Sequence, residues 1–239
     1  MAGKTTSTDR PRVLAYIIRT VGAGYRLKGS VPFVSHGRVF FGACKKNMRP
    51  DVKHGDYIMG ISGSAAGNPR RVILWMRVAE TMTFREAYER GKTDKVFRAI
   101  RGTAIHVRPR GLAAHFSPGD PECYEHIRGA HHSKDWKSDV RGRRDVFIVG
   151  EKQSWVIQSK AAPEVKAELV ELLKEGIHWK GLPTIRNPFT EHAQGKHATV
   201  TGFAAAQIIS RFSRLRVRRP LEESRPETSC PCDRTCACA

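Results

Sequence analysis

The spacing of apolar and polar positions predicts a chain built mainly from strands, with helices concentrated towards its end. The apolar run at 12–19 is rich in β-branched and aromatic residues, as expected of a buried strand. A Gly55-Asp56 turn leads into another apolar run, which Gly60 interrupts. Strands are predicted at 12–19, 37–45, 57–61, 71–79, 104–107, 144–150 and 154–158. The last two are expected to form a hairpin around residues 151–153.

Three helices are predicted from capping signals and from apolar spacing. A Thr-Phe-Arg-Glu capping box at 83–86 should open a short helix that stops at Gly91. Pro163 should open a second helix, because an apolar stripe opposite charged residues follows it and Gly176 ends the pattern. A third helix is expected over residues 201–214.

Consecutive strands joined by short turns, with few helices, indicate an α+β fold. We expect a mainly antiparallel curved sheet or a small β-barrel, flanked by about three helices. Residues 111–144 are polar and punctuated by Pro and Gly, which predicts a long irregular loop. The predicted organisation is a disordered leader at 1–11, a single domain at 12–215 and a disordered Arg/Cys-rich tail at 216–239.

Net charge adds a prediction about the partner. The 239 residues include 42 Lys and Arg against 23 Asp and Glu, a formal net charge of +19 at pH 7. Such an excess produces self-repulsion in a compact chain, and a polyanion relieves it while releasing condensed counterions. We therefore predict a nucleic acid or a nucleotide as the partner, with DNA favoured over RNA. An Arg-rich composition without any partner is the alternative.

Membrane and secretory signals are absent from the sequence pattern. The longest apolar run, 13–18, is far shorter than a membrane helix requires. The polar, basic N-terminus lacks the apolar segment of a secretory signal. An anionic membrane surface is a weaker partner than nucleic acid, because no basic amphipathic segment carries large aromatic anchors. We expect a cytoplasmic protein without a membrane partner.

The first candidate site lies between Cys44 and Gly60. Lys45, Arg49 and Asp56 place two cations and a carboxylate in this short stretch. Arg49 could fork onto a phosphate or a guanine edge, and Asp56 could accept from an exocyclic amine. The alternative is that Arg49 and Asp56 pair with each other and only pin the turn.

Short motifs in this stretch and beyond it resemble one known family. They are Tyr16-Ile17-Ile18-Arg19, Cys44-Lys45 with Arg49, Gly55-Asp56-Tyr57-Ile58-Met59-Gly60, His131-His132-Ser133 with Trp136 and Asp139, and Arg143-Arg144-Asp145-Val146-Phe147. Over roughly residues 12–212 the chain is similar to the nucleotide modification associated domain family, type 2. The resemblance implies a role beside DNA base-modification systems, many of them phage-linked or defence-linked, with enzymes of such systems as partners. The Gly-Asp turn also resembles that of base-binding barrels of the PUA, ASCH and EVE type, a fold-level analogy.

The second candidate site lies within residues 111–144, where His and Asp side chains are dense. His132 with Asp139 is the predicted acid–base pair, because a carboxylate that orients an imidazole is a common base arrangement. Arg144 would then steady a phosphate. The alternative is a solvated polar loop whose histidines contact phosphates or each other. No fixed zinc motif such as His-Glu-x-x-His occurs there.

Further cations and one aromatic complete the predicted binding set. Arg211, Arg214 and Arg216 run off the end of the last helix and could contact phosphates, although a helix dipole alone also favours cations there. Trp136 lies in a polar stretch and is the best stacking candidate. The predicted nucleotide- or nucleic-acid-binding residues are Arg19, Lys45, Arg49, Asp56, Trp136, Arg144, Arg211, Arg214 and Arg216.

Four thiols crowd the tail, namely Cys230, Cys232, Cys236 and Cys238. They could chelate zinc, but their spacing fits no zinc ribbon, so an incidental disordered tail is favoured over a zinc-binding regulator. The sequence does not identify a cofactor. The preferred function is a nucleic-acid- or nucleotide-binding protein associated with DNA base modification, which recognises a base or nucleotide in a basic pocket. The alternative is an enzyme that modifies or hydrolyses a nucleotide or base by His-Asp acid–base chemistry.

Overall fold

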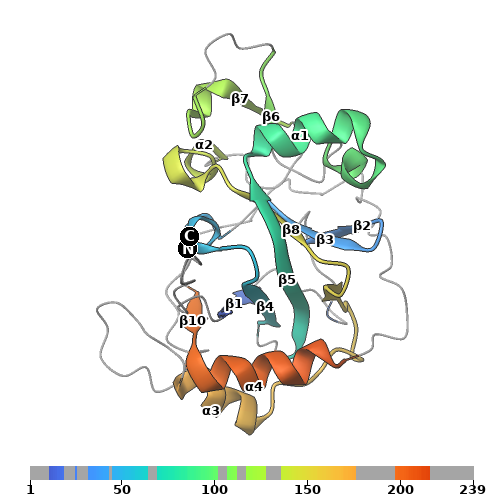
Figure 1. Ribbon diagram of the computed structural model, residues 1–239, viewed down its shortest axis with the longest axis vertical. Helices are drawn as coiled ribbons and strands as arrows, with labels where there is room; N and C mark the ends of the chain where they lie inside the picture. Colours follow the sequence, from blue (N-terminus) through green and yellow to red (C-terminus); the bar gives the residue numbers. More distant parts are fainter. Residues whose placement is uncertain are drawn as a thin grey trace, which may run out of the picture.

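The computed structural model describes residues 11–18, 25, 32–42, 45–63, 69–101, 107–111, 117–127, 136–175 and 197–215. Within these residues the chain forms one eight-stranded sheet and a separate two-stranded sheet. Two helices lie at one end of the main sheet, and a second group of helices lies with the small sheet at the other end (Figure 1).

The main sheet is mixed and curved. Its strand order is β10-β1-β4-β5-β8-β3-β2, and β9 pairs with β5 beside this path. The strands are β1 (Val13–Ile18), β2 (Phe33–Ser35), β3 (Arg38–Phe41), β4 (Tyr57–Ser62), β5 (Val72–Met82), β8 (Phe147–Gly150), β9 (Trp155–Val156) and β10 (Ala198–Val200). The β1–β4 pair is parallel, and the other described pairs in this sheet are antiparallel. The predicted α+β class with a curved sheet is confirmed, and the path between the described strands stays open instead of closing into a barrel.

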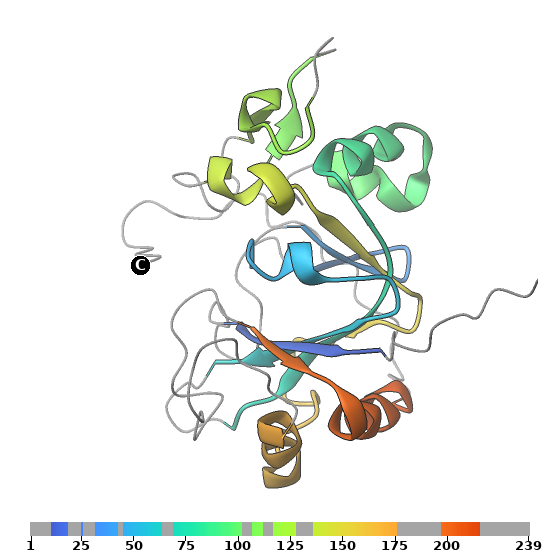
Figure 2. The same cartoon turned by 60° about the vertical axis from the view of Figure 1, so that its left-hand side comes forward.

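The long strand β5 joins the two halves of the sheet. Its residues 72–77 pair with β4, and its residues 78–82 pair with β8 on the other side. Both ladders contain a register shift, one at Gly60 and one after Val78. Such bulges bend a strand and increase its twist. Figure 2 shows β5 sweeping through the molecule from one half of the sheet to the other.

The expected hairpin between residues 144–150 and 154–158 is wrong. β8 and β9 both pair antiparallel with β5. The chain therefore runs in the same direction through β8 and β9, whereas the strands of a hairpin would run in opposite directions. A turn at 151–154 separates them, where the Ser154 N–H donates to the Glu151 carbonyl (3.0 Å). The Arg77 N–H of β5 donates to Ser154 Oγ (3.1 Å), which holds the turn against the strand. Because β5 supplies the backbone hydrogen-bond partners of both segments, the two segments do not pair with each other.

The predicted capping box is confirmed at the start of α1 (Phe84–Thr93). Thr83 Oγ1 accepts from the Glu86 N–H (3.1 Å), and the Glu86 carboxylate accepts from the Thr83 N–H (2.7 Å). The helix continues past Gly91, where it was expected to stop. The 3-10 helix η3 (Lys95–Arg101) follows it.

The helices α3 (Ala167–Glu175) and α4 (Gly202–Ser213) cover the half of the sheet that contains β1 and β10. The ring centroids of Trp75 on β5 and Phe212 on α4 lie 5.3 Å apart in this core. α3 begins later than the predicted start at Pro163, because the Val72 N–H of β5 donates to the Pro163 carbonyl (2.8 Å) and keeps that stretch extended. No described helix combines the length and apolar character that a membrane crossing requires.

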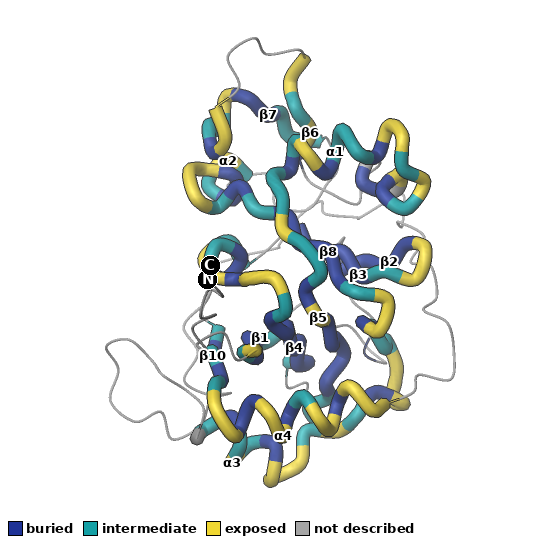
Figure 3. The backbone as a smooth tube through the Cα atoms, viewed as in Figure 1, coloured by how far each residue is buried: buried dark blue, intermediate teal, exposed yellow. Residues whose placement is uncertain are grey.

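Residues 111–144 contain more regular structure than the predicted irregular loop, and that prediction is wrong for the part described. The elements in this range are η4 (Pro121–Cys123), β7 (Tyr124–His126), α2 (Trp136–Asp139) and η5 (Gly142–Arg144), and β6 (Val107–Pro109) lies just before it. β6 and β7 form the small antiparallel sheet. These elements are very short, so they leave no periodic pattern in the sequence. Figure 3 shows them as a mixture of buried and exposed backbone beside α1.

The buried carboxylate of Asp145 holds this end of the molecule together. Its Oδ1 accepts from the Phe84 N–H at the start of α1 (3.0 Å). Its Oδ2 accepts from the Gly119 N–H (3.2 Å) and from the Tyr124 hydroxyl (2.7 Å). Burial, and then the nearby Asp145 charge, raise the pKa of Tyr124 far above its usual range, so this hydroxyl stays protonated and donates. Asp145 therefore links α1, β7 and the segment that leads into β8.

We expect Asp145→Asn to lower the free energy of unfolding by about 2–4 kcal/mol. An amide offers one acceptor oxygen, and its NH₂ group would face donors of the protein. Urea unfolding followed by circular dichroism measures the change. Glu168→Gln, at an exposed position of α3, is the control and should alter stability by less than about 0.5 kcal/mol. Equal stability of the two variants would contradict this role of Asp145.

Candidate functional site

Two segments that are distant in the sequence meet at the centre of the candidate site. Residues 45–51, which end in the 3-10 helix η2 (Arg49–Asp51), lie against residues 136–144. Lys46 Nζ donates to Ser138 Oγ (2.6 Å), and the Arg144 guanidinium donates to the Ser138 carbonyl (3.2 Å). Figure 2 shows η2, in light blue, beneath the yellow-green α2. The contact brings together four residues that the sequence predicted, namely Lys45, Arg49, Asp139 and Arg144.

Arg49 is completely buried in this contact. Its guanidinium donates to the carbonyl of Asp139 (2.7 Å) and to the carbonyl of Val146. It also lies over the Phe84 ring, 5.1 Å from the centroid. A guanidinium keeps its charge when buried, so it requires such partners, and its rigid fork can serve two carbonyls at once. Arg49 therefore fixes the chain on both sides of η5, a structural role that the prediction did not include.

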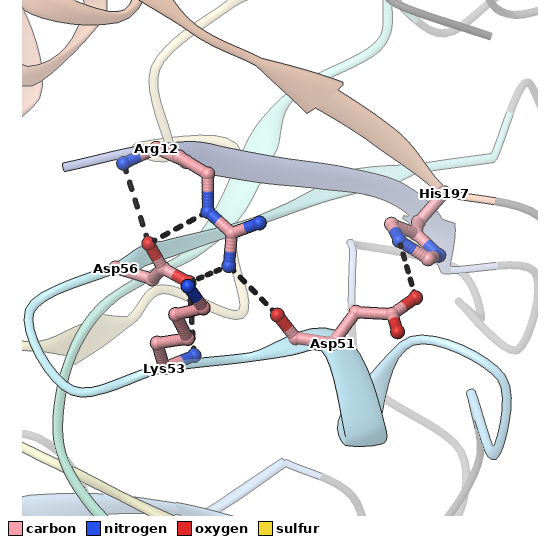
Figure 4. Close-up of polar contacts among 5 residues, drawn as sticks. All are labelled: Arg12, Asp51, Lys53, Asp56 and His197. Carbon is pink, nitrogen blue, oxygen red and sulfur yellow. Dashed lines mark hydrogen bonds and ion pairs between the residues drawn. The ribbon is translucent and has the colours of Figure 1, made fainter. Parts of the chain in front are cut away.

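Asp56 pairs with Arg12, and the interpretation in which it pairs with Arg49 is wrong. The Arg12 guanidinium donates to both carboxylate oxygens, from Nη2 at 2.6 Å and from Nε at 3.1 Å (Figure 4). The Lys53 N–H also donates to Asp56 Oδ2 (2.9 Å). Gly55, at φ +82°, permits the tight turn that presents this carboxylate. Asp56 is buried and anchors the residue that leads into β1.

Asp51, the last residue of η2, faces a histidine from near the opposite end of the chain. His197 Nε2 lies 3.8 Å from Asp51 Oδ2 (Figure 4). The guanidinium of Arg143, from η5, lies 3.9 Å from Asp51 Oδ1. The Arg12 guanidinium donates to the Asp51 carbonyl (2.7 Å). His197 directly precedes β10, and the antiparallel β10–β1 pairing carries it to this position.

The surroundings of His197 favour its neutral form. Burial is the main cause that lowers its pKa; Asp51 acts in the opposite direction, and the charges of Lys45 and Arg12 lower the pKa further. Sequence reasoning missed His197, Asp51 and Arg12, because nothing in a single sequence joins positions so far apart. The available signal was a histidine shortly before a β-branched run at 199–201.

Lys45 has an unusual backbone conformation beside this cluster. Its φ of +49° lies in the left-handed region, which residues other than Gly, Asn and Asp seldom adopt. Its ammonium lies 5.3 Å from the centroid of the Tyr16 ring on β1. Non-glycine residues in this region concentrate at functional sites, where the surrounding structure holds them.

Trp136, the predicted partner of Asp139 and the remaining predicted residues lie around this contact, away from it, or outside the described residues. Trp136 is half-buried at the start of α2, with its ring 6.2 Å from that of His126. Asp139 is buried, and its predicted partner His132 lies outside the described residues, so that pair stays a prediction. Arg211 and Arg214 lie at the end of α4 that is remote from β10 (Figure 1). Arg19, Arg216 and the four tail cysteines also lie outside the described residues.

The fold and this site define a basic α+β domain with a polar, charged cluster beside a curved sheet. Residues 11–115 match the model of a protein family described as nucleotide modification associated domain 2. The resemblance predicted from the sequence is confirmed over this range, and the family's description associates it with nucleotide modification. The matched range includes Arg12, Lys45 and Asp51 and ends before α2, η5 and His197. No curated protein and no solved structure matches the chain.

We expect Arg49→Met to lower the free energy of unfolding by about 2–4 kcal/mol. Methionine keeps most of the side-chain length, but it leaves the carbonyls of Asp139 and Val146 without these donors. Arg98→Met, at an exposed position of η3, is the control and should change stability by less than about 0.5 kcal/mol. Urea unfolding compares the two variants. If Arg49→Met were as stable as the wild type, the hydrogen bonds from Arg49 to these two carbonyls would contribute nothing to the stability of the fold.

Proposed function

We propose that this protein binds a nucleic acid or a nucleotide, in association with DNA base modification, through a basic face formed where residues 136–144 lie against residues 45–51. The basic face comprises Lys45, Lys46, Lys137, Arg141, Arg143 and Arg144. The observation that carries the proposal is the meeting of these cations from two distant segments, one of them inside the range that matches the family.

Two carboxylates among the residues that the structure describes form ion pairs with the basic face. Asp51 lies near Arg143, and Glu122 accepts from Lys137 (2.5 Å). Both are exposed or partly exposed ion pairs, which contribute little to stability. The side chain of Arg143 is 79% exposed, so a phosphate can reach it without any rearrangement of the core. Phosphates can therefore replace these carboxylates at low cost and release counterions as they bind.

Trp136 supports the recognition of a base at the same face. Its half-buried ring stands at the start of α2, next to Lys137, whose ammonium lies 5.9 Å from the ring centroid. Stacking of a base on such a ring contributes about 1–3 kcal/mol, and a neighbouring cation places a phosphate nearby. Arg211 and Arg214 form a second basic group at the end of α4, and we propose that they contact phosphates of a longer nucleic acid.

The affinity for a labelled single-stranded DNA should fall by about 10–100-fold between 50 and 200 mM salt, because several phosphates displace counterions. Fluorescence anisotropy measures this dependence. Arg141→Gln with Arg143→Gln should weaken binding about 5–30-fold and flatten the salt dependence by one to two released ions. Lys160→Gln with Lys166→Gln removes the same charge from exposed positions before α3 and serves as the control. Arg211→Gln with Arg214→Gln tests the second basic group.

An affinity that did not change with salt would exclude counterion release and would refute the proposal. An equal loss of DNA affinity in the Arg141/Arg143 and Lys160/Lys166 variants would show that binding depends only on the net charge of the protein. The basic face would then not be the binding site.

A second candidate function is an enzyme that modifies or hydrolyses a nucleotide or base. The His197–Asp51 pair favours it, because a carboxylate beside a neutral imidazole suits proton abstraction. Incubation with deoxynucleotides and with DNA, followed by mass spectrometry, tests for conversion. His197→Gln should then lower the rate by at least about 100-fold. Conversion that survives in His197→Gln and is lost in His132→Gln would assign the chemistry to the pair His132 and Asp139 predicted from the sequence.

A further inference from the structure

One side of α4 is exposed from its first turn to its C-cap residue, Arg214. The exposed positions recur at spacings of three and four residues, which places them in one stripe of the helix. Figures 1 and 2 show α4 at the outer end of the molecule, with α3 beside it. We call this stripe the α4 face; its members are Phe203, Ala206, Gln207, Ser210, Arg211 and Arg214.

The opposite stripe of α4 is buried and anchors the helix. The residues of α4 that belong to the core are Ala204, Ala205, Ile208 and Phe212. The centroid of the Phe212 ring lies 5.3 Å from that of Trp75 and 6.5 Å from that of Trp155. A helix anchored in this way presents its outer side chains on a rigid support, which precise recognition requires.

The α4 face carries cations but no carboxylate. Residues 192–221, which include α4, contain six Lys and Arg and no Asp or Glu. The exposed side of the neighbouring α3 differs, because it carries Glu168 and Glu171, and Lys174 Nζ donates to Glu171 Oε1 (2.7 Å). Mixed charges are typical of a helix surface that meets only water, whereas cations without carboxylates favour a polyanionic partner.

The other side chains of the α4 face suit the edges of bases. Gln207 can donate and accept a hydrogen bond at once, as the edge of adenine requires. Ala206 and Phe203, the latter 74% exposed, offer apolar contact to the methyl group of thymine. Arg211 and Arg214 follow at the end of the helix, where guanidinium groups can bind phosphates.

The dimensions of α4 fit the major groove of duplex DNA. An α-helix with its side chains is about 10–12 Å across, and this groove is about 12 Å wide. The 12 residues of α4 span about 18 Å, which corresponds to about five base pairs. The major groove of duplex RNA is too narrow for side chains to read. DNA is therefore the duplex that fits this helix.

We propose that α4 enters the major groove of duplex DNA, where Gln207 contacts base edges and Arg211 and Arg214 contact phosphates. The proposal rests on the proposed function and deepens it, because it names duplex DNA as a ligand and assigns part of its recognition to α4. The glutamates of α3 repel phosphates, so the DNA passes α4 on the side away from α3.

The test is fluorescence anisotropy of the full chain with a labelled DNA duplex of about 20 base pairs. Gln207→Glu should weaken binding by about 10–100-fold, because its carboxylate meets phosphates and the acceptors of base edges. Glutamate keeps the size and the helix propensity of glutamine, so the fold is retained. Gln153→Glu, at an exposed position in the turn before β9, makes the same chemical change and should stay within about twofold of wild type.

Selection from a pool of random DNA duplexes tests whether α4 reads bases. Wild type should enrich a short sequence with a fixed adenine. Gln207→Ala should lose this adenine preference and bind the enriched sequence about 5–30-fold more weakly. Arg211→Gln with Arg214→Gln should instead weaken the binding of all sequences to a similar extent. A duplex RNA of the same sequence should bind Gln207→Glu and Gln153→Glu equally, and a difference there would overturn the placement in a DNA groove.

Equal duplex DNA affinity for Gln207→Glu and Gln153→Glu overturns the proposal, and so does a selection in which wild type enriches no sequence. If Phe203→Ser then abolishes a concentration dependence of the sedimentation coefficient, the α4 face is an interface between copies of this chain. In either case, a loss of single-stranded DNA affinity in the Arg141/Arg143 variant leaves the proposed function intact. Absence of salt-dependent binding to any DNA overturns both.

Discussion

The burial of one guanidinium determines how the two parts of this chain fit together. Arg49 retains its positive charge in the interior, so its donors must find acceptors there, and two backbone carbonyls on either side of η5 provide them. This requirement orients the segment 136–146 against η2. The side chains of Arg141, Arg143 and Arg144 are carried on that segment. Their position next to Lys45 and Lys46 is therefore a consequence of a contact made below the surface.

Several acidic side chains of the described residues serve the fold itself. Asp145 joins three elements at one end of the molecule, and Asp56 fixes Arg12 at the start of β1. Carboxylates occupied in this way are not exposed to balance cations at the surface. The excess of Lys and Arg over Asp and Glu therefore gives the greatest local positive charge where short, exposed elements such as η5 carry arginines. This distribution connects the overall composition to a particular place on the molecule.

Local signals in the sequence predicted local structure well. The capping box before α1 and the Gly-Asp turn before β4 depend on neighbouring residues alone, so both could be found. The parallel β1–β4 pair and the continuation of β8 into β9 depend on which strand edge is available, and that is a property of the whole sheet. The same limit applies to the site. Lys45, Arg49 and Asp56 were found as chemically capable residues, but the partners of Arg49 and Asp56, and the approach of His197 to Asp51, follow from tertiary pairing.

The pairing pattern of the sheet has a consequence for where the domain can be cut. The family match ends at residue 115, yet β3, β5 and β1 each pair with a strand that comes later, namely β8, β9 or β10. A polypeptide that stopped at the end of the match would expose backbone N–H and C=O groups along three strands at once. Such open edges recruit other chains and promote aggregation. The range that carries the family signature is thus smaller than the range that can fold into a self-contained unit.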